Sequence, residues 1–74
     1  MEESISDIVR FHRKESGLSR KELADMAGVG KTVIFDIENE KETIRFSTLN
    51  KVLTALNIKI NFESPLMERL HEES

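Results

Sequence analysis

The stretch SRKELADMAGVGKTVIFDIEN, residues 19–39, decides the fold of this chain. Ser19 can cap a helix, and Glu22 stands three residues later, which is the spacing of a capping box. Gly28 then closes this helix, because glycine adopts the left-handed conformation after a helix at no steric cost. A second helix starts after Gly30. Two short helices joined by a tight turn are therefore expected here.

Helices are also expected on both sides of this stretch. Residues 5–15 carry apolar positions at helical spacing, which predicts an amphipathic helix. Its stripe consists of Ile5, Ile8, Val9 and His12. After a polar loop, a further helix is expected with Ser47 as its cap and Asn57 at its end. The apolar positions of the two later helices are Ile34, Ile37, Leu49, Val52, Leu53 and Leu56.

The periodicity changes after residue 57. Ile58, Ile60 and Phe62 alternate with polar residues, which predicts a strand over residues 58–63. One strand is not stable alone, so we expect it to pair with a second copy of the chain across a two-fold axis. An extended arm lying on the helices is the alternative. Residues 64–74 form an acidic tail or a short helix that starts at Ser64-Pro65.

The length of the chain predicts one small domain that benefits from assembly. At 74 residues, folding buries only about 60% of the surface of the unfolded chain. The chain has no cysteine, which excludes disulfides and thiolate metal sites. Oligomerisation therefore remains as the expected support.

The net charge of −3 is distributed unevenly along the chain. Residues 1–62 contain equal numbers of Lys/Arg and Asp/Glu, so the excess negative charge lies in residues 63–74. Within residues 10–21, by contrast, five basic residues stand against Glu15 alone. A basic region and an acidic tail indicate two different partners, although ordinary surface scatter gives the same pattern.

Catalysis and membrane insertion find no support in the sequence. GVGKT at residues 28–32 resembles part of a phosphate-binding loop, but Asp25 stands where that motif requires glycine. His12 and His71 have no nucleophile at a triad spacing, and no metal site or cofactor is expected. Glu2, Glu3 and Asp7 argue against a signal peptide, and no apolar run approaches about 18 residues. We expect a cytoplasmic protein that is not an enzyme.

The residues LSRKELADMAGVGKTVIFDIENEK resemble the core of the Cro/cI-like, XRE-type helix-turn-helix family. The match covers about residues 5–57. Its most specific elements are Glu22-Leu23-Ala24, Ala27-Gly28-Val29, Ile34 and Ile37-Glu38-Asn39. The following strand and tail resemble the HipB-type antitoxins, whose strand pairs between subunits. The resemblance implies an all-α, lambda-repressor-like helix-turn-helix domain of four to five helices at residues 4–57, with a C-terminal β-strand at 58–63 that pairs across a homodimer.

The resemblance also implies which residues contact DNA. The expected base contacts are Lys31, Thr32, Phe35 and Asp36. The expected phosphate contacts are Arg10, Arg20, Asn39, Lys41 and Arg45. The expected dimerisation residues are Ile58, Ile60 and Phe62. Lysine can donate to guanine, and threonine can meet a thymine methyl; exposed residues at a helix start would look the same. Glu38 is expected to pair internally with Arg13.

Four positions depart from the family pattern. Gly30 replaces the usual Ser/Thr cap, Phe35 replaces a small polar residue, and Asp36 replaces a neutral or basic one. Glu40 stands where the family has glycine, so a different turn is expected there.

The expected function is sequence-specific binding of double-stranded DNA at a palindromic operator, with half-sites about 34 Å apart. The layout favours a transcriptional repressor that is the antitoxin of a HipBA-like toxin–antitoxin system, binds a toxin and autoregulates its operon. A phage-type or stand-alone repressor without a toxin is one alternative. A protein-interaction module that has lost DNA binding is another, and Phe35 and Asp36 favour it.

Overall fold

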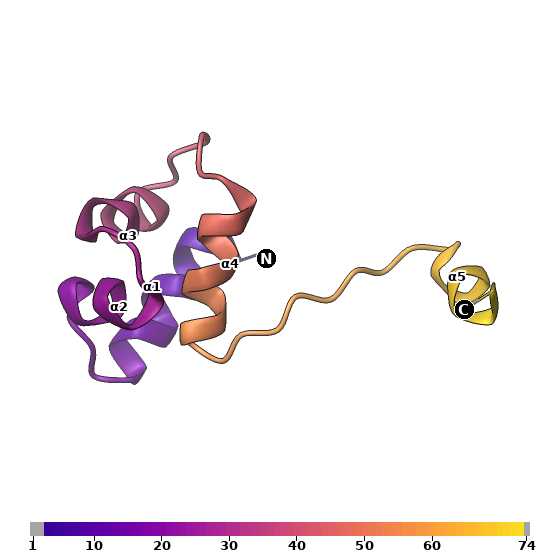
Figure 1. The fold of residues 1–74 in the computed structure, drawn as a ribbon, viewed down its shortest axis with the longest axis horizontal. Coiled ribbons are helices and arrows are strands. Elements are labelled where there is room, and N and C mark those ends of the chain that lie inside the picture. The colour runs from indigo at the N-terminus through magenta and orange to yellow at the C-terminus, as the bar shows by residue number, and fades with distance from the viewer. Residues whose placement is uncertain (1–2, 74) are drawn as a thin grey trace.

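Within residues 3–73, five helices make up an all-α fold, in agreement with the four to five helices that the sequence predicts. The computed structural model describes residues 3–73, so Glu2 and the last residue of the tail, Ser74, lie outside the described residues. The helices are α1 (Ile5–Glu15), α2 (Arg20–Ala27), α3 (Lys31–Glu38), α4 (Phe46–Ala55) and α5 (Met67–Glu73). Figure 1 shows α1–α4 packed into one body, while α5 stands apart at the end of an extended segment.

The capping box predicted at the start of α2 is confirmed. The Ser19 hydroxyl accepts from the Glu22 backbone N–H at 3.0 Å, and the Glu22 carboxylate accepts from the Ser19 backbone N–H at 2.9 Å. The Ser19 backbone N–H, and after it the Ser19 side chain, stabilise the charged carboxylate and so lower the pKa of Glu22. Gly28 ends α2 at φ 70°, so the turn into α3 uses the left-handed conformation that only glycine adopts freely.

One face of each of α1–α4 builds the core. The buried apolar residues are Val9, Leu23, Ala24, Ile34, Ile37, Val52, Leu53 and Leu56. The main packing contacts join α2 to α3, α1 to α3 and α2 to α4. α3 therefore has its inner face fixed by two neighbouring helices, which leaves its outer face free to meet a ligand.

The stripe predicted for α1 is only partly right. Val9 is fully buried, but Ile5 is 53% exposed. The buried positions beside Val9 are instead the polar residues Ser6 and Arg13. Ser6 is drawn inward because its hydroxyl donates to the Ile37 carbonyl at 2.6 Å. α1 is thus rotated from the position that hydrophobicity alone predicts, since it satisfies polar groups at the end of α3.

Two local predictions between α3 and α4 are wrong. α4 begins at Phe46 with Arg45 at the cap position and no side-chain cap, so Ser47 lies inside the helix. The turn after α3 was expected to change at Glu40, but Glu40 takes φ 59°, the left-handed region that glycine favours. A side chain there costs about 1 kcal/mol. The end of α4 agrees with the sequence, because Asn57 also has φ 59°.

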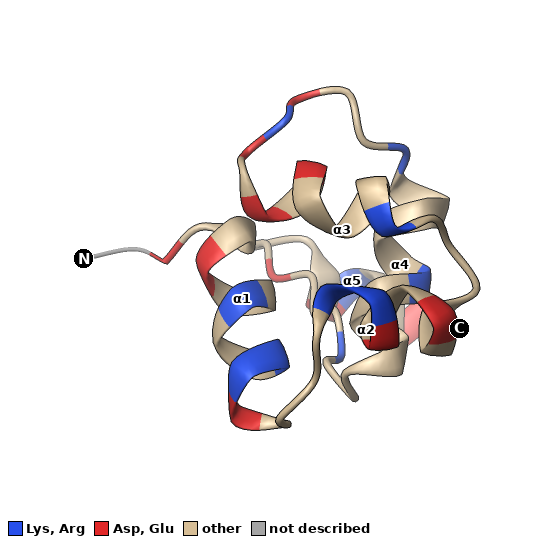
Figure 2. Ribbon diagram, turned by 90° about the vertical axis from the view of Figure 1, so that its left-hand side faces the viewer, with Lys and Arg blue, Asp and Glu red and all other residues tan. Residues whose placement is uncertain are grey.

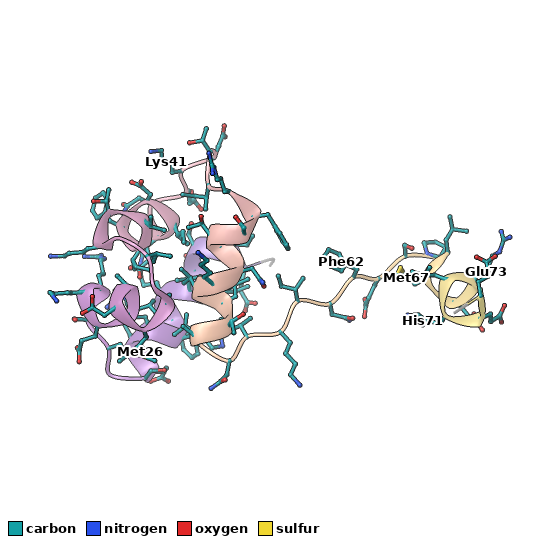
Figure 3. The ribbon with its side chains drawn as sticks, in the orientation of Figure 1. Met26, Lys41, Phe62, Met67, His71 and Glu73 are labelled. Carbon is teal, nitrogen blue, oxygen red and sulfur yellow. The ribbon has the colours of Figure 1, made fainter. Side chains whose placement is uncertain are left out.

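Residues 58–66, which we call the arm, contain no strand in the described structure. A β-ladder requires a second strand, and residues 3–73 of one chain supply none. Figures 1 and 3 show the arm leaving the helical body, with Phe62 on the arm and Met67 beyond it in α5. α5 starts at Met67 rather than at Pro65 because Pro65 and Leu66 form a turn. The pairing of the arm across a dimer stays a prediction.

None of the helices within residues 3–73 has both the length and the apolar composition needed to cross a bilayer.

Candidate nucleic-acid interface

A buried ion pair joins α1 to the end of α3. Arg13 Nε donates to Glu38 Oε2 at 2.6 Å, and Arg13 Nη2 donates to Glu38 Oε1 at 3.0 Å. The Glu38 side chain is fully buried and that of Arg13 is 10% exposed. Burial acts to raise the pKa of Glu38, but the hydrogen bond and charge of Arg13, with those of Arg20, outweigh it and hold that pKa below its usual value. The pairing expected from the sequence is confirmed.

Two further arginines reach the same glutamate. Arg20 Nε lies 3.3 Å from Glu38 Oε1, and Arg10 Nε lies 3.8 Å from the same oxygen. Arg10 Nη2 also donates to the Glu38 backbone carbonyl at 2.6 Å. Arg13 already neutralises the carboxylate, and the side chains of Arg10 and Arg20 are 41% and 40% exposed. The cluster therefore presents excess positive charge to solvent.

The outer side of α3 carries the predicted base-contact residues. Ile34, Ile37 and Glu38 are buried. Residues at the other positions of the helical repeat face away from them. Lys31, Thr32 and Phe35, which we call the reading face, are exposed. Figure 2 shows basic positions on α1, at the start of α2 and on α3, and acidic positions at the far end of α3 and in the loop after it.

Asp36, the unusual acid of α3, is held at the edge of this face. Its carboxylate lies 3.4 Å from Lys41 Nζ, and its side chain is only 23% exposed. The Lys41 backbone N–H also donates to the Asp36 carbonyl at 3.0 Å. Lys41 therefore offsets the charge of Asp36 and reduces its repulsion from phosphates. The assignment of Asp36 to a base and of Lys41 to a phosphate stays a prediction.

The remaining phosphate candidates differ in what they already bind. Asn39 uses one donor inside the fold, since its Nδ2 donates to the Phe35 carbonyl at 2.7 Å and closes the end of α3. Arg45 is exposed at the cap position of α4.

Sequence reasoning did not foresee that Arg20 stacks on Phe35, with its guanidinium carbon 5.7 Å from the ring centroid. The only signal was the pairing of two unusual residues, an arginine and a phenylalanine, at family positions that normally hold polar residues.

The three predicted dimerisation residues have different environments. Ile58 packs against the core of its own chain, and its N–H donates to the Leu53 carbonyl at 2.9 Å. Ile60 is 37% exposed and Phe62 is 67% exposed. Ile60 and Phe62 therefore offer the larger exposed surface, and the assignment of all three residues to a dimer interface stays a prediction.

Comparison with known proteins agrees with this geometry. The helix-turn-helix family profile matches residues 9–62. An uncharacterized HTH-type transcriptional regulator of Sinorhizobium fredii, y4mF, is 39% identical over 61 residues, which are 82% of this chain and 80% of that protein. The control protein C.SmaI of Serratia marcescens is 30% identical over 60 residues, which are 81% of this chain and 71% of that protein. A chain in the structure of a HipA-HipB-O2-O3 complex has a TM-score of 0.75 at 20% identity, covering 88% of this chain and 96% of that one.

Proposed function

This chain belongs to the helix-turn-helix family of DNA-binding transcription regulators, and on that premise we propose that it is a sequence-specific repressor that binds a palindromic operator as a homodimer in the cytoplasm. The observation that carries the proposal is the reading face. Lys31, Thr32 and Phe35 are exposed on α3, whose other side is fixed against α1 and α2. A rigid helix with an exposed polar and apolar edge suits the major groove.

Phosphate contacts supply the affinity in this proposal. The proposed cationic phosphate contacts are Arg10, Arg20, Lys41 and Arg45, and Asn39 adds a neutral donor. The surplus charge of Arg10 beside the Arg13–Glu38 pair supports such a contact, because Glu38 does not need it for neutrality. Each cation that meets a phosphate releases counterions, so binding must weaken steeply with salt.

The decisive experiment is selection of bound duplexes from a random pool, followed by a salt titration on the selected site. We expect enrichment of a two-fold symmetric sequence. Four cationic phosphate contacts per subunit predict a slope of about −7 for log K against log salt concentration in the dimer. No enrichment would reject specific DNA binding and would favour a protein-interaction module. A flat salt dependence would reject the phosphate assignments.

A finer proposal is that the protein is an antitoxin that autoregulates its operon. The arm and α5 leave the helical body, as an appended interaction segment would, and the fold resembles that of a chain in a HipA-HipB-O2-O3 complex. The test is co-purification with the product of the neighbouring gene, using the full chain and a variant that stops at residue 63. A complex that needs the tail supports an antitoxin. A protein that represses without any such partner is a stand-alone repressor.

A further inference from the structure

Arg20 is held from two sides by residues of α3. Its Nε donates to the buried carboxylate of Glu38 at 3.3 Å, and its guanidinium lies over the Phe35 ring, 5.7 Å from the centroid. A distance below about 6 Å is that of a cation–π contact. Arg13 anchors Glu38 in turn. The plane of the Arg20 guanidinium is thus fixed by two residues of α3.

This arrangement leaves particular donors of Arg20 available. The hydrogen bond to Glu38 uses Nε, and no acceptor for the two terminal nitrogens is found among residues 3–73. The side chain remains 40% exposed. Paired terminal N–H groups in a fixed plane match the O6 and N7 acceptors of guanine. The same fork also matches a phosphate, so what favours a base edge is the contact of Arg20 with Phe35, an exposed residue of the reading face.

Phe35 provides a second chemical feature beside these donors. Its ring is 51% exposed although it lies on α3 next to Arg20. The C5-methyl group of thymine is the apolar group that the major groove offers to such a ring. A guanidinium and an exposed aromatic ring in contact therefore complement a guanine that has a thymine as its neighbour.

We propose that Arg20 and Phe35 form one reading unit that recognises a guanine adjacent to a thymine in each half-site. The proposal rests on the proposed DNA-binding function, and it moves Arg20 from the phosphate contacts to the base contacts. Glu38 is the positioning residue of the unit, because it orients Arg20 without touching DNA.

The test uses the duplex selected from the random pool. Each guanine is replaced in turn by 7-deazaguanine, which lacks N7, and each thymine by deoxyuridine, which lacks the methyl group. We expect one guanine and one neighbouring thymine in each half-site at which affinity falls, by roughly 5- to 150-fold for the guanine. Selected duplexes whose affinity is unchanged by every replacement would overturn the reading unit while leaving DNA binding intact. A pool without enrichment would overturn both.

Variants of the protein then show which residue causes each loss of affinity on base replacement. Arg20→Met removes the guanidinium, so it should abolish the 7-deazaguanine effect at one guanine of each half-site, and Phe35→Ala should abolish the deoxyuridine effect. Lys21→Ala is the matched control, since Lys21 is the next residue of α2 and pairs only with Asp25 at the surface. Circular dichroism melts confirm that each variant folds. If Arg20→Met weakens binding but retains full sensitivity to 7-deazaguanine, Arg20 is a phosphate contact and the proposal is wrong.

Discussion

Removing Glu38 should destabilise the domain strongly, because its buried carboxylate is the partner of the Arg13 guanidinium. Glu38→Leu leaves the Arg13 guanidinium buried without its partner, and Arg13 is only 10% exposed. Loss of one member of a buried pair costs about 3–5 kcal/mol. A domain of 74 residues has a total stability of about 4–11 kcal/mol. The substitution therefore removes a large fraction of the free energy of unfolding.

A double-mutant cycle separates the cost of leaving Arg13 buried without Glu38 from the net contribution of the ion pair to stability. Arg13→Met should cost less than Glu38→Leu, because Glu38 keeps Arg20 at 3.3 Å and Arg10 at 3.8 Å. The double variant should recover most of the loss, since apolar side chains of similar volume replace the pair. The exposed pair Lys21–Asp25 is the control, and Asp25→Ala should change stability by less than about 1 kcal/mol.

Urea unfolding followed by circular dichroism at a fixed protein concentration measures each corner of the cycle. With a denaturant slope of about 1 kcal/mol/M for so small a chain, a loss of about 3–5 kcal/mol in Glu38→Leu should lower the midpoint by about 3–5 M. A loss below about 1 kcal/mol, or a double variant as unstable as the sum of the singles, would refute the reasoning that Glu38 compensates a buried charge.

Three further predictions concern acid, the turn after α3 and the arm. Burial acts to raise the pKa of Glu38, but Arg13 holds it below its ordinary value of 4.5. The stability that charged Glu38 contributes is therefore present above pH 4.5 and is lost as pH falls through the lower pKa of the folded state. Urea midpoints measured from about pH 5 to about pH 2 should fall less steeply in Glu38→Gln than in the parent protein. Glu40→Gly should raise stability by about 0.5–1 kcal/mol, because Glu40 has φ 59°; a lower urea midpoint would contradict this. Ile60→Asp should dissociate the dimer in sedimentation velocity, whereas Lys59→Asp, on the other face of the predicted strand, should not; an unchanged dimer in Ile60→Asp would reject strand pairing.

The central part of the fold was predictable because its signals are local. The capping box at Ser19 and the left-handed Gly28 depend on residues only a few positions apart. The register of α1 was not predictable in the same way. Ser6 and Arg13 are buried because they bond to Ile37 and Glu38, which lie 31 and 25 residues away. Hydrophobic periodicity contains no information about such long-range polar partners.

In the candidate site, too, features set by local spacing were predictable, whereas contacts between distant residues were not. Helical spacing alone places Lys31, Thr32 and Phe35 on the outer side of α3, opposite Ile34 and Ile37. It does not reveal that Arg20 stacks on Phe35 or that Lys41 pairs with Asp36, since both contacts depend on side-chain directions in the folded chain.

The separation of the two sides of α3 has a consequence for protein engineering. Ile34, Ile37 and Glu38 are buried and hold the helix in place, whereas Lys31 and Thr32 are exposed and can be varied in a library with little effect on the core. Phe35 is different, because it must vary together with Arg20. A library that varies residues 20 and 35 together and keeps Glu38 constant would select binders of new operator sequences on the same fold.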